Sequence, residues 1–439
     1  MIYPSLLIFI IAFLIRLLNI YFSNTDVNTY ISEDQFLYWD WALQKAFTSQ
    51  STLPQNVLVE RMPGSFLFFQ FAIWLVGKNL FKVLIMQIII DSFNCFIIAS
   101  IAKILNRNFF LIAGLLAAIS PLLVIVSSQV LSDTIFLLFF NCFIYFIIKF
   151  HQNNDSKYVF LAALFLSLSL FTRTIVLPLI ILSLFILTFV YIKNKFNVIN
   201  TIKMLSLFLI FSLILVLPRI INNYNNYGTV NLTNQNGYHF AHWVVPGVLD
   251  LGSEQSKAEY YEKLKKVSKK IETIENPFEK SSVLSKLAIN TLLSTDKVNI
   301  ILAWCKGAFL NVFAPSLLLD KKIRSLHHPS FYESERNVKL WLLKLFNEGK
   351  YKTYKNIFIF TLFSSVVFVI LTSLGLFICL KNYTFSAIFS LFLVTYFLFI
   401  TGPVFSPKYI HPIITIFIIF ETLALLKIYG LIRKFFQQS

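Results

Sequence analysis

The chain has 439 residues, of which 57% are hydrophobic and only 13% are charged, and its formal net charge at pH 7 is +17. So few charges cannot cover that much apolar surface in water, which excludes a water-soluble domain and predicts an all-α polytopic membrane protein. A strongly basic chain could also bind nucleic acid. Membrane proteins, however, collect Lys and Arg for topological reasons, and the sequence carries no nucleic-acid motif.

Ten apolar stretches are long enough to predict membrane-spanning helices. Two further apolar segments, 64–77 and 298–316, fit either a span or an interfacial helix, so a bundle of about 10–12 transmembrane helices is expected. The ten predicted spans cover about 4–22, 80–103, 109–128, 130–150, 158–173, 175–193, 204–221, 356–380, 384–402 and 409–428.

The positions of Lys and Arg predict the orientation of these spans. Each of the short connections near 104–108, 151–157, 194–203 and 381–383 carries Lys or Arg within it or at the ends of the spans beside it, so these connections and both termini are expected in the cytoplasm. The other side receives a first loop, residues 23–79, and a long central segment, residues 222–355. The predicted organisation is a transmembrane module over 1–221 that includes the first loop, the extracytoplasmic central segment, and C-terminal transmembrane helices over 356–439.

The cytoplasmic connections are about a dozen residues long or shorter, too short to form a nucleotide-binding domain. The sequence also has no glycine-rich phosphate-binding loop and no D-x-D motif for a metal-held nucleotide. We therefore do not expect the substrate to arrive as a soluble nucleotide.

Acidic side chains gather on the extracytoplasmic side. The stretch ISEDQFLYWDWA (31–42) holds Glu33, Asp34 and Tyr38, and a helical spacing would put Asp34 and Tyr38 on one face. In one interpretation, the aromatic residues of this stretch form an interfacial belt and its carboxylates are simply solvated. Asp133 would then do no more than cap the N-terminus of the fourth predicted span. The alternative is that Asp34 and Asp133, which lie at one membrane level, form a site for sugar chemistry.

Four cations are predicted at the same level: Arg61, Arg173, Arg219 and Lys408. Such side chains can simply extend towards lipid headgroups, or they can converge to bind a phosphate. Asp91, inside the second predicted span, should face the bundle and pack with Asn94 or Arg16, because a charge facing lipid is costly.

Six motifs in order resemble those of the protein O-mannosyltransferase and aminoarabinose transferase superfamily, membrane glycosyltransferases of the GT-C fold. The stretch from Asp34 to Tyr38 resembles the D-E-x-x-Y of that family's first loop. Arg61-Met62-Pro63-Gly64 is similar to its H/R-P-P-G segment, and LFTRTIVLP (170–178) resembles its L-T-R-P segment. Three further stretches resemble family segments: SPLLVIVSSQVLSDTIF (120–136), LPRIINNYNNYGTVNLTNQNGYHF (217–240) and PKYIHPI (407–413).

The resemblance implies a GT-C bundle with interfacial helices in the first loop and a polyprenyl-phosphate sugar as donor. It implies Asp34 as the catalytic carboxylate and Asp133 as the second acid. Contact with the lipid phosphate would come from Arg61, Arg219 and Lys408, and the substrate would be lined by Glu33, Tyr38 and Tyr409. The chain departs from the family at three of these positions. Gln35 stands where the family has Glu, and Asn222 and Lys408 each stand where the family has an Arg, in two different motifs.

The expected reaction is transfer of a hexosyl or pentosyl group to a hydroxyl of a glycan, lipid or protein acceptor, with inversion and with Asp34 as general base. The resemblance also implies a bacterial inner membrane and an active site that faces the periplasm. No cofactor is certain, and a divalent metal stays open. A lipid-linked glycan polymerase or ligase, or a polyprenyl-linked glycan flippase, is the alternative, although a flippase should carry more intramembrane ionisable residues than Arg16 and Asp91.

Overall fold

A computed structural model describes residues 2–23, 26–330 and 338–438. The chain is 82% helical and has no strand among these residues, which confirms the predicted all-α polytopic membrane protein. Seven helical stretches are long and apolar enough to cross a membrane, and the number rises to nine if each of two bent helix pairs counts as one span. The seven are Tyr3–Tyr21, Leu80–Leu105, Asp133–Asn153, Thr174–Lys193, Gly349–Asn382, Thr384–Thr401 and Pro407–Phe435.

Two predicted spans are bent at a proline. The stretch 109–128 consists of α7 (Phe109–Ile119) and α8 (Pro121–Ser127), which meet at 55°. The stretch 204–221 falls within α12 (Val198–Leu213) and α13 (Leu217–Tyr227), which meet at 63°. A proline stands in the first turn of α8 and of α13, where its missing N–H group interrupts the helical hydrogen-bond ladder.

The helices of the N-terminal half pack around α6 (Leu80–Leu105). It contacts α1 (Ile2–Tyr21), α7 and α9 (Asp133–Asn153), and α9 in turn packs on α10 (Ser156–Thr172). The chain then passes through the short η1 (Thr174–Val176) into α11 (Leu177–Lys193). In the C-terminal half, α21 packs against α22 and α23, and α23 reaches back to α7. The remaining C-terminal elements are η4 (Gly349–Tyr351), α21 (Lys352–Asn382), α22 (Thr384–Thr401), η5 (Pro407–Ile413) and α23 (Ile414–Gln438).

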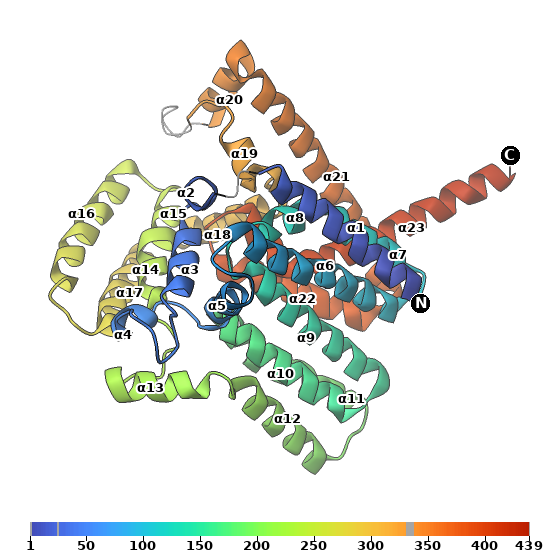
Figure 1. Ribbon diagram of the computed structural model, residues 1–439, viewed down its shortest axis with the longest axis horizontal. Helices are drawn as coiled ribbons and strands as arrows, with labels where there is room; N and C mark the ends of the chain where they lie inside the picture. The colour runs from blue at the N-terminus through green and yellow to red at the C-terminus, as the bar shows by residue number, and fades with distance from the viewer. Residues whose placement is uncertain (1, 24–25, 331–337, 439) are drawn as a thin grey trace.

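Several helices outside the bundle lie together on the left in Figure 1, namely α3, α4 and α14–α17. The start of α1 and the end of α23 lie on the right. The first loop forms α2 (Val27–Tyr30), α3 (Asp34–Leu43), α4 (Gln55–Leu58) and α5 (Gly64–Val76). The central segment forms α14 (Gln235–His239), η2 (Phe240–Val244), α15 (Val245–Leu249), α16 (Glu254–Ile271), α17 (Pro277–Ser294), α18 (Lys297–Phe313), η3 (Ser316–Leu319), α19 (Lys321–Arg324) and α20 (Val338–Asn347).

The first-loop helix α5 has the properties of an interfacial helix. Its 13 residues span about 20 Å at about 1.5 Å per residue, which is shorter than the bilayer's hydrocarbon core of about 30 Å. Phe71, Trp74 and Leu75, spaced for one helix face, are all more than half exposed. Its other face, including Phe66 and Phe69, is buried against α3 and the start of α6.

The buried ion pair of Arg16 and Asp91 connects three helices inside the bundle. Arg16 Nε lies 2.6 Å from Asp91 Oδ2, and both side chains are fully buried. The same guanidinium donates hydrogen bonds to the carbonyl oxygens of Ala117 and Ala118, at the end of α7. Because Pro121 has no N–H group, the Ala117 carbonyl has no ordinary helical partner at that position. Arg16 therefore neutralises the charge of Asp91 in α6 and satisfies backbone carbonyl groups at the bend between α7 and α8. Arg16 was one of the two predicted partners of Asp91.

We expect Arg16→Met to destabilise the protein by about 3–5 kcal/mol, because it leaves the Asp91 carboxylate buried without a counterion. The double variant Arg16→Met/Asp91→Leu should recover part of this loss. Thermal unfolding in detergent measures both effects. Lys157→Met, which breaks the exposed pair with Asp155, is the control and should change the unfolding temperature little. A double variant no more stable than Arg16→Met would contradict the expected role of the pair.

Candidate functional site

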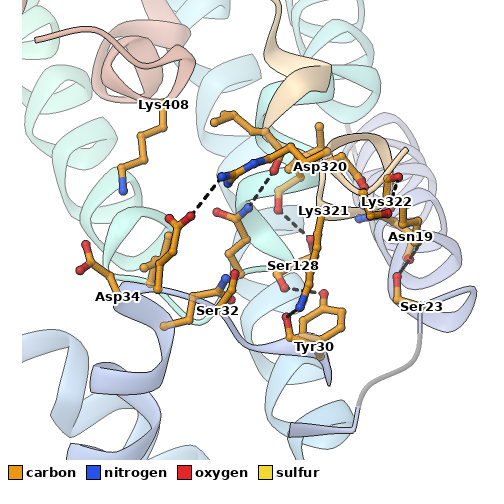
Figure 2. A pocket seen from close by; sticks show the side chains of 18 of the residues that line it. Asn19, Ser23, Tyr30, Ser32, Asp34, Ser128, Asp320, Lys321, Lys322 and Lys408 are labelled. Carbon is orange, nitrogen blue, oxygen red and sulfur yellow. Dashed lines mark hydrogen bonds and ion pairs between the residues drawn. The ribbon is translucent and has the colours of Figure 1, made fainter. Parts of the chain in front are cut away.

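Two pockets meet at Asp34. The smaller has a volume of about 170 Å³ and the larger about 660 Å³. Both are lined by Asp34, Leu131 and Lys408, so a carboxylate and an ammonium group stand where the two cavities join. Figure 2 shows Asp34 and Lys408 together at one end of the larger pocket. A group bound in one pocket can therefore come close to a group bound in the other.

The Asp34 carboxylate is accessible to a ligand. Its side chain is 56% exposed, and Arg61 Nη2 lies 3.6 Å from Asp34 Oδ1. A second nitrogen of Arg61, Nη1, donates a hydrogen bond to Gln235 Oε1 at 3.2 Å. Arg61 thus connects the first loop with the central segment, and it holds a cation beside the accessible carboxylate.

Asp133, in contrast, is already engaged. Its carboxylate is almost fully buried and lies 2.5 Å from Arg173 Nη1. The Arg173 guanidinium also lies over the ring of Phe136, with 5.5 Å between its carbon and the ring centre. Burial works against the positive charge of Arg173, but Asp133 more than compensates, so the pKa of Arg173 is raised. The geometry gives Asp133 the role of counterion to Arg173, which faces the smaller pocket.

A close approach of two helices brings these groups together. A Cβ atom at Gly64, the first residue of α5, would lie 2.8 Å from both the Phe171 carbonyl oxygen and Thr172 Cγ2 at the end of α10. Only glycine fits this contact. Arg61, three residues before Gly64, and Arg173, one residue after Thr172, both line the smaller pocket.

The connection between α8 and α9, residues 128–132, forms a wall shared by the pockets, and side chains from elsewhere hold its backbone. Gln87 Nε2 donates to the carbonyl oxygens of Ser127 and Gln129, both at 2.7 Å. Gln35 Oε1 accepts from the Val130 backbone N–H at 3.0 Å. Three further hydrogen bonds hold this wall: Tyr30 OH donates to the Ser128 carbonyl, Tyr38 OH donates to Ser132 Oγ, and Gln129 Nε2 donates to the Leu319 carbonyl.

Tyrosine is protonated at physiological pH, and burial strengthens this at both tyrosines that hold the wall. Burial raises the pKa of Tyr30 to about 12. Burial also raises the pKa of Tyr38, although the charge of Arg61 partly opposes this. Both hydroxyl groups can therefore donate to the α8–α9 connection at any physiological pH.

The larger pocket is covered on one side by Ser316–Ser325, which we call the strap. Lys321 Nζ donates to the carbonyl oxygens of Thr29 and Tyr30, and Lys322 Nζ donates to the carbonyl oxygen of Asn19 at 3.2 Å. Arg324 Nη2 lies 3.1 Å from Glu33 Oε1. Figure 2 shows Lys322 and Asn19 at the end of the pocket away from Asp34. The strap therefore joins the central segment to the end of α1 and to the start of the first loop.

The structure brings most of the predicted site residues to one place. Asp34, Tyr38, Arg61, Asp133 and Lys408 all line the smaller pocket, and Glu33 lines the larger one. Tyr409, next to Lys408, is partly buried and interacts electrostatically with Arg173 and Asp133.

Arg219 lies apart from this group. It lines neither pocket. Its nitrogens donate to the carbonyl oxygens of Leu232 and Leu58 at 2.7 and 3.0 Å, and its guanidinium lies over the ring of Phe47. These contacts hold the backbone just before Arg61, so the influence of Arg219 on the pocket is indirect.

Gln235 and Glu60 are among the residues of the smaller pocket that were not predicted as site residues. Gln235 lines it from the central segment, and Glu60 lies beside Arg61. Burial raises the pKa of the Glu60 carboxyl, and Arg61 partly offsets the rise. The position of Glu60 next to Arg61 in the sequence could have indicated it, whereas nothing in the sequence marks Gln235.

Among the described residues, no group of three or more His, Cys, Asp or Glu side chains is arranged to hold a metal ion. Asp34 has Arg61 beside it, and Asp133 is bound to Arg173.

Comparison with known proteins finds a family that part of the chain resembles. Residues 60–221 match the sequence model of the family described as dolichyl-phosphate-mannose-protein mannosyltransferase. The predicted resemblance to that family is confirmed. It is a family of the GT-C type, which implies a membrane glycosyltransferase that acts on a lipid-linked sugar donor and an acceptor. The matched range holds Arg61, Gly64, Asp133 and Arg173 but not Asp34 or Lys408. No curated protein matches the chain.

We expect Arg173→Met to weaken both folding and activity, since it leaves Asp133 buried without its counterion. In a cycle with Asp133→Leu, the two substitutions should show a coupling of about 0.5–3 kcal/mol in unfolding free energy. Arg173→Lys should be intermediate, because it keeps the charge but loses the planar guanidinium. Additive effects in the cycle would mean that the ion pair does not hold this side of the pocket.

Proposed function

We propose that the protein transfers a sugar from a polyprenyl-phosphate donor to an acceptor hydroxyl at the extracytoplasmic face of the membrane, with inversion at the anomeric carbon. The observation that supports this most strongly is the position of Asp34. It is a largely exposed carboxylate at the junction of two pockets, with cations nearby, in a chain whose family implies a membrane glycosyltransferase.

In this proposal Asp34 acts as general base. The acceptor oxygen attacks the anomeric carbon and its proton passes to the Asp34 carboxylate. The bond between the anomeric carbon and the phosphate oxygen breaks, and its electron pair leaves with the polyprenyl phosphate. Because Asp34 is more than half exposed, it can afterwards release the proton to water. General-base assistance of this kind is typically worth about 10²–10⁴-fold in rate.

The smaller pocket suits the sugar phosphate of the donor. Three cations line it, Arg61, Arg173 and Lys408, and they come from three separate parts of the chain. Negative charge develops on the phosphate oxygen as the glycosidic bond breaks, and positioned cations stabilise that charge. The larger pocket on the other side of Asp34 is then left for the acceptor, with the attacking oxygen at the junction.

We expect Asp34→Asn to lower sugar transfer by about 10²–10⁴-fold while the protein still folds, because the amide cannot take the proton. The measurement starts from cells in which the gene is deleted and then supplied again, either unchanged or as the Asp34→Asn variant. Mass spectrometry compares the glycolipids and glycoproteins of the two. Asp40→Asn, an exposed acid on the same helix α3, is the matched control and should keep activity. Transfer by Asp34→Asn at the unchanged level would refute the assignment, and Asp133→Asn provides an independent test of the pocket.

Lys408→Ala should raise the KM for the donor and slow the release of the leaving phosphate, whereas Lys408→Arg should retain much of the activity. Steady-state kinetics with a polyprenyl-phosphate sugar in detergent, once the sugar is known from the mass spectra, measures both. An unchanged KM and kcat for Lys408→Ala would remove Lys408 from the proposed phosphate site.

A further inference from the structure

The backbone immediately before Asp34 has an unusual conformation. Glu33 has φ 53° and ψ −131°. A positive φ is uncommon for a residue other than glycine, and this ψ lies outside the left-handed helical region. Asn154, another residue with positive φ, has ψ 23°, which is the ordinary left-handed conformation. Glycine would adopt the Glu33 conformation readily, since it has no Cβ atom.

Strained backbone of this kind persists only where surrounding contacts hold it. On the side before Glu33, Lys321 of the strap donates to the carbonyl oxygens of Thr29 and Tyr30. On the side after it, Gln35 accepts from the Val130 N–H. Both neighbouring stretches are therefore anchored to parts of the fold that lie far away in the sequence.

The Glu33 side chain itself is held by Arg324, 291 positions further along the chain. The pair is exposed to solvent, with 57% of Arg324 and 70% of Glu33 accessible. An ion pair so exposed adds little to global stability. Its location is what matters, because it fixes the one peptide that sets the direction of the first turn of α3, where Asp34 begins the helix.

Relaxation at Glu33 would move Asp34. If φ at Glu33 returned to a negative value, the peptide joining it to Asp34 would rotate, and the Asp34 carboxylate would leave its position 3.6 Å from Arg61 Nη2. A misplacement of about 1 Å at a reacting group can lower a rate about 100-fold. The strap, which lines the larger pocket, would thus also influence the reaction through the position of Asp34.

We propose that Glu33 is a positioning residue: its ion pair with Arg324 holds the strained peptide that directs Asp34 to the junction of the two pockets. The inference rests on the proposed function in one respect, that Asp34 is the base. It differs from the expectation that Glu33 simply lines the substrate pocket, because it predicts that glycine at this position, whose backbone does not need to be held, costs less activity than alanine.

The test compares alanine with glycine in place of Glu33. Glu33→Ala keeps the Cβ atom that strains the backbone but removes the ion pair, so turnover should fall roughly 10- to 100-fold with little change in KM. Arg324→Ala should give a similar loss, and Glu33→Ala/Arg324→Ala should be no worse than either alone. Glu33→Gly needs no ion pair to hold its backbone, so it should lose less turnover than Glu33→Ala, and adding Arg324→Ala to Glu33→Gly should cost less turnover than Arg324→Ala does in the unchanged protein. Glu348→Ala, which breaks another exposed ion pair, with Lys350, is the matched control and should be neutral.

Thermal unfolding in detergent gives a second measurement that does not depend on the assigned chemistry. Glu33→Gly should unfold about 1–3 °C above Glu33→Ala. Arg324→Ala should lower the unfolding temperature of the unchanged protein but not that of Glu33→Gly. If Asp34→Asn were active while these shifts appeared, the proposed base would fail and the structural part of the inference would stand. Equal impairment by the glycine and alanine substitutions, or additive losses for Glu33→Ala and Arg324→Ala, would overturn the positioning role.

Discussion

The candidate site depends on one buried ion pair that lies outside it, within the helix bundle. Arg16 and Asp91 neutralise each other between α1 and α6, and the spare donors of Arg16 satisfy the carbonyl groups exposed where α7 gives way to α8. Burying either charge alone would be costly. Because the bend between α7 and α8 is fixed in this way, the connection that follows α8 arrives at a defined place, and that connection forms the wall shared by the two pockets.

Two ion pairs lie around that connection, and the pair of Asp34 with Arg61 is more exposed than the pair of Asp133 with Arg173. Asp133 is buried and bound to Arg173, so it organises a cation, whereas Asp34 is largely exposed beside Arg61. Two carboxylates that line the same pocket therefore differ in exposure and in partner, which is set by their surroundings and not by their residue type. Arg61, Arg173 and Lys408 line the smaller pocket, and positive charges placed there would stabilise the negative charge of a departing phosphate.

Much of this was visible in the sequence, because apolar length, charge asymmetry and motif order are local properties. They predicted the helical class, the inward-facing Asp91, and the group formed by Asp34, Arg61, Asp133 and Lys408. The bends of two spans could have been expected from Pro121 and Pro218. Arg219 shows the limit: an arginine at the membrane surface can bind a phosphate or backbone carbonyl oxygens, and only the folded chain decides which. Contacts such as the one between Glu33 and Arg324 join distant segments, and no local pattern indicates them.

The shortness of α10 has a consequence for where the chemistry would take place. Its 17 residues span about 25 Å, which is about 5 Å less than the hydrocarbon core of a typical bilayer. A short apolar helix is accommodated by local thinning of the bilayer or by neighbours that reach towards the interface. Arg173 directly follows α10, so on the proposed function, with this end of α10 facing outward, local thinning would place the cations of the smaller pocket below the usual level of the headgroups. On the proposed function, the donor's phosphate could stay at its normal depth, and the acceptor would be the substrate that has to move down into the membrane.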